Sequence, residues 1–323
     1  MLKEVYKNIY VNEIPLPKNP LKAIKSYIIK SKDKNLIIDT GFNIEECRDV
    51  FFKGIEELKL DFNKTELFLT HLHSDHSGMA SELFKKGVKI YASEKDGQLI
   101  NKMTTTEYWE NFEKRKVCFD LEKDNVSYSN HPGYKYCPRE KMNFTFLKDG
   151  DKLEVGEYNF KVIDISGHTP GQIGLYDKEH KIFFCGDHIL DRITPNITFW
   201  SFEMDALKVY FENLNKIYDY DIKYLFTAHR SDVSDHKQRI NEIFHHHNER
   251  INEILDIVKN EKKSPRDIAT EMTWAIRCKD WDDFPNSQKW FAVGEVMAHL
   301  QYLKNLGKVK EDIINNVMYY KAI

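Results

Sequence analysis

Three histidines and one aspartate lie within six consecutive positions of this 323-residue chain, in the run Thr70-His71-Leu72-His73-Ser74-Asp75-His76. Residues two apart in an extended turn point to the same side, so His71 and His73 can bind one metal ion. Asp75 and His76 follow one turn later and can face a neighbouring ion. Imidazole suits Zn²⁺ and iron, and a carboxylate adds charge that stabilises a pair of cations. No cysteine lies nearby to close a structural zinc site, so the run favours an open, catalytic site.

Further candidate ligands occur later in the chain, each just after a short apolar stretch. They are His168, Asp187 with its neighbour His188, and His229. Because the ends of strands converge at one edge of a sheet in α/β proteins, these side chains can meet the first cluster. Each alone is a common loop residue, but the ordered set predicts a metal site.

A run of three histidines, His245 to His247, is a weaker signal than it looks. Consecutive residues on a helix diverge by about 100°, so the three cannot hold one ion together. His247 falls on the apolar stripe of the predicted helix Asp235–Asn260. We therefore expect a core or surface role for this run.

The elements that would position the candidate ligands alternate between strands and helices. The sequence predicts strands at Ala23–Lys30, Asn35–Thr40, Leu67–Thr70, Val88–Ala92, Tyr158–Ile165, Gln172–Tyr176, Ile182–Cys185 and Tyr224–Thr227. It predicts helices at Ile44–Leu58, Ser77–Lys86, Ala206–Tyr218 and Asp235–Asn260. This alternation indicates a layered α/β fold.

These motifs resemble those of the metallo-β-lactamase superfamily. The HxHxDH motif is matched in full by the run at residues 71–76. Three later elements of the family match at His168, within a GHTPG run, at Asp187, within a GD pair, and at His229. Asp39-Thr40-Gly41 matches the family's first motif, and the resemblance covers about Tyr27 to Val258. It implies an α/β fold, the four-layer αβ/βα sandwich, with two metal ions at one edge. The resemblance places His71, His73 and His168 on the first metal, Asp75, His76 and His229 on the second, and Asp187 between them.

The implied chemistry is hydrolysis. Two cations that share a water lower its pKa toward neutrality, which yields a bridging hydroxide as nucleophile. The same ions stabilise the charge that develops on a carbonyl or phosphoryl oxygen. Asp75 is the candidate to take up and return a proton, and Asp187 holds both ions. We expect Asp39 to orient a ligand imidazole rather than to bind metal.

Two residues beside the ligands have an open role. His188 is not a ligand in the family and is expected either to support a ligand or to contact substrate. Arg230 stands where many relatives have glycine, directly after His229. It could bind an anionic substrate group through two hydrogen bonds. The favoured interpretation is a solvated loop charge.

Two further segments extend the predicted catalytic domain, which spans residues 1–260. An aromatic-rich insertion at about 97–143 predicts either a lid over the metals or a small satellite core. Residues 264–323 are predicted to form helices at Pro265–Trp274 and Ala292–Leu306 and a hairpin at Val309–Tyr320 that turns at Asn315-Asn316. This segment resembles the winged-helix-like tail of certain hydrolases of the same fold, which include lactamase-like endoribonucleases.

Charge and composition narrow the classes of partner. The chain has 48 basic and 51 acidic residues, and the segment from Ser264 onward has eight of each, so neither favours nucleic-acid binding. A structural role, dimer formation or covering of the active site is therefore preferred for the tail.

Five cysteines without a CxxC pair disfavour a disulfide framework and fit a reducing cytoplasm. No apolar run approaches the ~20 residues of a membrane span, so we expect a soluble protein.

We expect a metal-dependent hydrolase that cleaves an ester-like bond of a small-molecule substrate, with a thioester favoured. The expected cofactors are two divalent metal ions, with zinc preferred and iron or manganese as alternatives. Endoribonuclease-like cleavage of RNA and mononuclear-iron sulfur chemistry remain as enzymatic alternatives. In a different class, the protein would be a regulatory or binding protein that acts through its winged-helix module. Formation of a homo-oligomer is left open.

Overall fold

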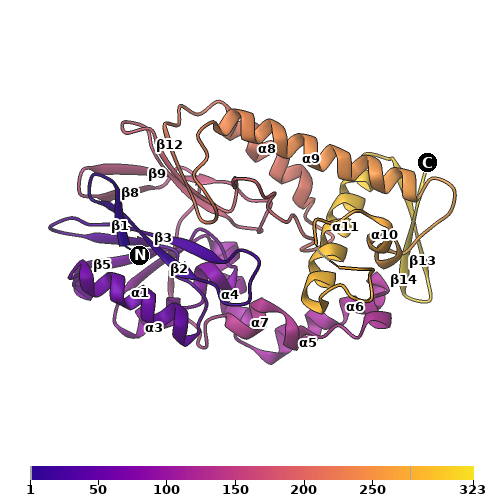
Figure 1. Cartoon of the computed structure of the whole chain (residues 1–323), viewed down its shortest axis with the longest axis horizontal. Coiled ribbons are helices and arrows are strands. Elements are labelled where there is room, and N and C mark those ends of the chain that lie inside the picture. Colours follow the sequence, from indigo (N-terminus) through magenta and orange to yellow (C-terminus); the bar gives the residue numbers. More distant parts are fainter. Residues whose placement is uncertain (1, 277) are drawn as a thin grey trace.

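Two β-sheets lie face to face, each with helices on its outer surface (Figure 1). In the described residues of a computed structural model, 2–276 and 278–323, the first sheet has seven strands that are neighbours in chain order. They are β1 (Leu2–Tyr6), β2 (Ile9–Pro15), β3 (Ala23–Ile29), β4 (Asn35–Ile38), β5 (Thr65–Phe68), β6 (Lys89–Ala92) and β7 (Phe144–Phe146). The second sheet runs in the order β12 (Tyr224–Thr227), β11 (Ile182–Gly186), β10 (Ile173–Asp177), β9 (Tyr158–Asp164) and β8 (Lys152–Val155).

The apolar alternation of the strands explains why the sheets stack. In β9, for example, Tyr158, Phe160 and Val162 are buried while Asn159 and Lys161 are exposed. The buried set packs against apolar side chains of β3, β4 and β5 in one core between the sheets. Burial of this apolar surface at about 25 cal/mol per Å² is the main force that holds the two sheets together.

Helices cover both outer faces and complete four layers. The first sheet carries α1 (Glu45–Glu57) and α3 (Ala80–Lys85), whose buried residues join its outer face. The second carries α8 (Ala206–Tyr218) and α9 (His236–Ile257), which form a separate core with β9, β11 and β12. This is the layered α/β arrangement that the sequence predicts. Strands β1, β2, β7 and β8 were not predicted, and η1 (Phe62–Lys64) precedes β5.

One predicted helix is wrong in its bounds. The sequence predicts a single helix at Ser77–Lys86, but the structure has α2 (Ser74–Ser77) followed by α3 after a break at Gly78-Met79. The Met79 N–H donates to Thr40 Oγ1 at 3.2 Å instead of continuing the helical pattern. The break places Asp75 and His76 on a short helical turn of their own.

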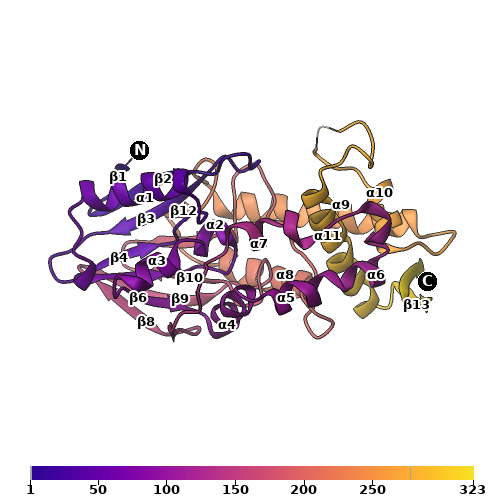
Figure 2. The same ribbon diagram turned by 90° about the horizontal axis from the view of Figure 1, so that it is seen from below.

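The aromatic-rich segment is helical and connects two cores. It contains α4 (Glu94–Met103), α5 (Thr106–Glu113), α6 (Arg115–Phe119), η2 (Leu121–Asp124), η3 (Tyr128–Asn130) and α7 (Pro132–Tyr136), so the predicted start near residue 97 falls inside α4. Trp109 packs into the core of the first sheet, whereas Phe119 and Leu121 pack against the C-terminal helices. Figure 2 shows this segment on the face turned to the viewer, where it extends from the sheets to the C-terminal end.

The C-terminal segment lies at the opposite end of the long axis from the sheets (Figure 1). It contains α10 (Pro265–Glu271), α11 (Asn286–Asn305) and a hairpin of β13 (Val309–Ile314) and β14 (Val317–Ala322). The hairpin turns at Asn315 and Asn316, whose φ angles of 51° and 65° are those of a tight two-residue turn. The turn lies where the sequence predicts it. Helix α11 begins earlier than the predicted Ala292, and the winged-helix description of this segment stays a prediction.

Among the described residues, no helix is both long enough and apolar enough to cross a membrane. All five cysteines are free thiols.

Candidate metal centre

The candidate ligands come from strand ends of both sheets. His71 and His73 lie in the loop after β5, and Asp75 and His76 lie on α2. From the second sheet, His168 lies between β9 and β10, and Asp187 and His229 follow β11 and β12. The stacked sheets thus bring residues that are up to 158 positions apart to one edge.

Two glycines permit close packing directly beside the candidate ligands. Gly186 precedes Asp187 with a φ of 52°, and a Cβ atom there would lie 2.7 Å from Thr70 Oγ1. Gly167 precedes His168 with a φ of 134°, and its Cβ would lie 2.5 Å from that of Tyr210. Only glycine accepts both the backbone angle and the close packing at these positions.

His71, His73 and His168 form the first cluster. The Nε2 atom of His71 lies 3.1 Å from Nδ1 of His73, and the ring of His168 is 5.0 and 4.6 Å from those two rings. One ligand atom of each residue lies within 4.8 Å of the others. Three imidazole nitrogens at this spacing can share one metal ion.

Asp75, His76 and His229 form the second cluster, with ligand atoms again within 4.8 Å of one another. Asp187 lies between the clusters. Its Oδ1 atom is 3.5 Å from Nε2 of both His76 and His229, and its Oδ2 atom is 3.8 Å from Nε2 of His168. The carboxylate therefore presents one oxygen to each cluster.

Several polar atoms of these clusters are buried without a hydrogen-bond partner in the described residues. They are Nε2 of His76, His168 and His229 and Oδ1 of Asp187. A buried polar atom without a partner costs about 1–3 kcal/mol. Since these atoms converge and are of the types that bind zinc and iron, a metal ion would satisfy them together. The donor set fits the metals that the sequence predicts.

The opposite ring nitrogens are anchored by hydrogen bonds. Nδ1 of His76 lies 2.8 Å from Asp39 Oδ2, and Nδ1 of His229 lies 2.7 Å from the carbonyl oxygen of Ala23. Nδ1 of His168 lies 2.8 Å from the carbonyl oxygen of Asn196. Such bonds fix the tautomer and aim the free nitrogen at the metal position.

Asp39 contacts the ring nitrogen of His76 that faces away from the second cluster. A left-handed backbone, with a φ of 60°, turns the chain at the end of β4. The carboxylate then accepts hydrogen bonds from the Thr70 N–H at 2.8 Å and the Thr70 hydroxyl at 2.7 Å, besides its contact with His76. Asp39 belongs to none of the three groups of side chains that could hold an ion in the described residues.

The electrostatics of the centre favour neutral imidazoles on one side and a positive charge on the other. Burial lowers the pKa of His73 to about 3 and that of His71 well below its usual value, so both rings have a free lone pair at neutral pH. Burial also acts to lower the pKa of His76, but attraction to Asp39, Asp187 and Asp75 outweighs it and raises that pKa. Burial acts to raise the pKa of Asp75, yet His76 and His229 lower it to about 2. The carboxylates thus attract positive charge, which metal cations would supply.

His188 and Arg230 lie outside the clusters. His188 is fully buried, with its ring centroid 5.2 Å from that of Tyr210, and it belongs to none of the potential metal groups in the described chain. Arg230 has a left-handed φ of 63°, and its Nη2 atom donates to the Pro20 carbonyl at 2.8 Å. The arginine therefore holds a neighbouring loop. In the run of three histidines, His247 is buried against His299, with 3.1 Å between Nδ1 and Nε2, while His245 is exposed.

Asp96 is a residue of the site that sequence reasoning missed. It lies on α4 and is almost fully buried. Its Oδ2 atom accepts from the Leu72 N–H at 3.0 Å and the Thr169 hydroxyl at 2.6 Å, and Oδ1 accepts from the Gly171 N–H at 2.8 Å. Asp96 thus ties the loop of His71 and His73 to the loop of His168. Its sequence position, on a helix and away from every motif, gave no signal of this role.

The candidate ligands open onto a cavity of about 320 Å³. Its lining includes His73, Asp75, His168 and Asp187 at one part. The remaining wall is mostly apolar and comes from the aromatic segment, the loop after β11 and α11, with Tyr108, Trp109, Phe112, Phe199, Trp200 and Trp290. The C-terminal segment therefore contributes directly to the cavity.

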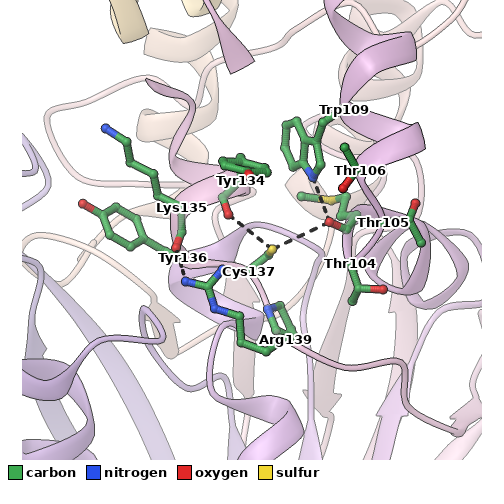
Figure 3. Close-up of a pocket in the computed structure, with 11 residues that line it drawn as sticks. Thr104, Thr105, Thr106, Trp109, Tyr134, Lys135, Tyr136, Cys137 and Arg139 are labelled. Atoms are coloured by element: carbon green, nitrogen blue, oxygen red, sulfur yellow. Dashed lines mark hydrogen bonds between the residues drawn. The ribbon is translucent and has the colours of Figure 1, made fainter. Parts of the chain in front are cut away.

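A second pocket, of about 550 Å³, lies beside α5 and α7 (Figure 3). Met103 and Trp109 line both this pocket and the cavity at the candidate ligands, so they form part of the wall between the two. The indole N–H of Trp109 donates to the Met103 carbonyl at 2.8 Å, and the Cys137 thiol contacts the same carbonyl at 3.7 Å. These bonds fix the dividing wall.

The family model of the metallo-beta-lactamase superfamily matches residues 20–229, which contain all the candidate ligands. The chain belongs to this superfamily. The membership makes it a hydrolase of the metallo-beta-lactamase fold, with side chains that could hold the divalent metals typical of the superfamily.

Three similar proteins illustrate the relationship. A metallo-beta-lactamase family protein from Thermus thermophilus is 22% identical, with a TM-score of 0.81 over 99% of this chain and 100% of that one, which shows a shared fold that includes the C-terminal segment. Hydroxyacylglutathione hydrolase GloC of Haemophilus influenzae is 31% identical over 50% of this chain and 64% of its own length. Acyl-coenzyme A thioesterase MBLAC2 of Homo sapiens is 26% identical over 51% of this chain and 58% of its length. The chain thus matches about three fifths of the length of these two curated relatives.

Proposed function

We propose that this protein is a thioesterase that uses two divalent metal ions, with zinc as the preferred metal. The observation that supports it most directly is the pair of ligand clusters that share Asp187 and leave buried ring nitrogens without partners. His71, His73 and His168 would hold the first ion, and Asp75, His76 and His229 the second. Asp187 would contribute one oxygen to each.

When bound, the cations would supply a water that ionises near neutral pH and would polarise the carbonyl of the substrate. Asp75 would accept the proton of the attacking water. In support, its Oδ2 atom lies in the second cluster, 3.2 Å from His229 Nε2, and its side chain lines the cavity. In the hydrolysis, the water oxygen bonds to the carbonyl carbon and the C–S bond breaks. The thiol leaves with the proton returned from Asp75, and the acyl group leaves as a carboxylic acid.

The lining of the cavity and the similar proteins of known activity favour a thioester over RNA as the substrate. A mostly aromatic wall suits an apolar acyl group, whereas an RNA backbone calls for a basic groove. A hydroxyacylglutathione hydrolase and an acyl-coenzyme A thioesterase are among the similar proteins. We also propose that residues 264–323 form a separate module that covers the active site, since Gln288, Trp290 and Phe291 line the cavity.

A substrate panel on metal-loaded protein tests the proposal. It contains an acyl thioester, the matching oxygen ester, a lactone, a lactam, a phosphodiester and a short RNA. We expect the thioester to be hydrolysed with the highest kcat/KM. Removal of the metal with a chelator should abolish the activity, and addition of zinc should restore it. Faster cleavage of the phosphodiester or RNA, or activity that survives complete metal removal, would overturn it.

A further inference from the structure

The cavity at the candidate ligands contains a basic residue that the hydrolytic chemistry does not use. Arg115, the first residue of α6, lines the same cavity as His73 and His168. It is the one arginine or lysine among the lining residues in the part of the chain that the structure describes. The acidic residues of the lining, Asp75 and Asp187, belong to the proposed metal ligands.

Among the residues that the structure describes, the guanidinium of Arg115 has no partner of opposite charge. Within residues 2–276 and 278–323, no carboxylate lies within 4.0 Å of it, and no side-chain hydrogen bond involves it. It lies instead against two aromatic rings, 5.6 Å from the centroid of Phe112 and 5.8 Å from that of Phe199. In contrast, Arg266, at the same end of the molecule, is paired with Asp124 at 2.9 Å.

This environment disfavours a bare cation. Burial lowers the pKa of Arg115, although a guanidinium still remains charged at neutral pH. The two rings attract the cation but offer it no hydrogen-bond acceptor. A guanidinium has a planar fork of N–H donors that matches a carboxylate or a phosphate, and such bonds are strong in a desolvated site.

We propose that Arg115 binds an anionic group of the substrate, a carboxylate or a phosphate, while the apolar part of the substrate lies against the aromatic wall. This inference rests on the proposed function, because it assigns the substrate of that thioesterase to anionic acyl thioesters. The anion can belong to the thiol part or to the acyl part of the thioester. Arg115 is then a specificity-determining residue away from the metal ligands.

Three thioesters distinguish these two sources. They are the 3-phenylpropionyl thioester of N-acetylcysteamine, which is neutral, the same acyl thioester of 3-mercaptopropionate, and the 3-(4-carboxyphenyl)propionyl thioester of N-acetylcysteamine. Wild-type protein should have a KM about 10-fold or more lower for one of the charged thioesters than for the neutral one. Arg115→Gln should raise that KM by about 10–100-fold, the loss expected for hydrogen bonds between charged groups, and leave kcat and the neutral substrate unchanged.

Two control variants sharpen the test. Lys114→Gln removes the same charge from the exposed neighbouring residue and should change none of the three KM values. Arg115→Lys keeps the charge without the planar fork and should recover part of the preference. Equal effects of Arg115→Gln on all three thioesters, or no effect on any, would overturn the inference.

A binding measurement separates this inference from the proposed function. Tryptophan fluorescence reports on the cavity, because Trp109, Trp200 and Trp290 line it. In metal-free protein, where no metal ion competes for the carboxylate, 4-phenylbutyrate should bind about 10-fold or more tightly than its neutral amide, and Arg115→Gln should remove the difference. If this discrimination is seen but no thioester is hydrolysed, the thioesterase proposal fails and the anion site stands. If thioesters are hydrolysed but Arg115→Gln leaves binding unchanged, the anion site fails alone.

Discussion

The two clusters of the candidate metal centre, its two halves, are supported by different parts of the molecule. In the second cluster, His76 is held by Asp39 at the end of β4, and His229 is held by the Ala23 carbonyl at the start of β3. Both supports belong to the first sheet. In the first cluster, His168 is held by the carbonyl of Asn196, in the loop after β11. That loop is in turn held by the C-terminal helix α11.

The contact with α11 is specific. The side-chain amide of Asn196 donates to Glu295 Oε2 at 2.8 Å and to the Phe291 carbonyl at 3.4 Å. Glu295 is buried, and Arg250 of α9 lies 3.5 Å from its other oxygen. One half of the centre therefore depends on the sandwich alone, and the other also depends on a helix about 100 residues later in the chain. The C-terminal segment therefore helps to support the candidate metal centre.

The largest effect is expected where the two halves meet. Asp187→Asn removes the charge shared between the clusters, so both ions should bind weakly. Because metal ions supply several kcal/mol of transition-state stabilisation, thioester kcat/KM should fall by about 10³-fold or more. The kcat/KM from steady-state kinetics and the metal content of the purified variant should fall together. Asp221→Asn, at an exposed position, is the matched control, and metal loss from that variant would contradict a specific role of Asp187.

The next effect separates the second half from the first. Asp39→Asn weakens the contact to His76 Nδ1 and should reduce affinity for one ion by about 10–100-fold, as changes to residues that support ligands do. The other ion should be retained. Zinc titration of metal-free protein, followed by calorimetry, measures the two affinities. As a control, Asp49→Asn on the exposed face of α1 should bind both ions normally. Equal loss of both ions from Asp39→Asn would contradict the separate support of the two clusters.

The converse effect should arise from the far end of the chain. Glu295→Ala frees Asn196 and should weaken the ion held by His71, His73 and His168 by about 10-fold, while the second ion stays in place. The visible spectrum of the cobalt-substituted protein reports the change in that ligand set. Glu295→Gln, which keeps an acceptor for Asn196, should restore the spectrum. Glu253→Ala removes another partner of Arg250 without touching Asn196, and a spectral change in that control would argue for a purely structural effect.

The smallest effect is expected at Arg230, which touches neither half. Arg230→Gly relieves a left-handed backbone that costs about 1–2 kcal/mol and loses a hydrogen bond worth about 0.5–1.5 kcal/mol. The two nearly cancel, so the melting temperature should change by only a few degrees. KM for an anionic thioester should change less than about threefold, because the side chain bonds to Pro20. A large rise in that KM would assign Arg230 to substrate binding instead.

The sequence predicted the parts of the molecule whose signal lies in residue type and local spacing. His71 to His76 can be recognised as a metal-binding run because few other roles need that density of histidine and aspartate. Helix α8 and strand β12 have the predicted bounds, since α8 is regularly amphipathic and β12 is a short apolar run. The Asn315-Asn316 turn was predicted because asparagine tolerates the left-handed backbone of a tight hairpin.

The residues that support the ligands could not be predicted in this way. Asp96 acts on groups up to 75 positions away, and Glu295 acts on Asn196 at a distance of 99 positions. Their function arises from tertiary contacts, and an aspartate or glutamate on a helix is otherwise ordinary. Likewise, Arg115 is one charge among many in the sequence, and only the structure shows that it lines the cavity without an acidic partner in the described part of the chain.

The central claim is that two cations, held by two clusters, together support thioester hydrolysis. The most direct test titrates zinc into metal-free protein and records bound zinc and the rate of thioester hydrolysis on the same sample. We expect activity to rise as bound zinc approaches two per chain and to stay absent in Asp187→Asn under the same conditions. Full activity with no bound metal, or zinc binding to two per chain without any thioester hydrolysis, would contradict the account.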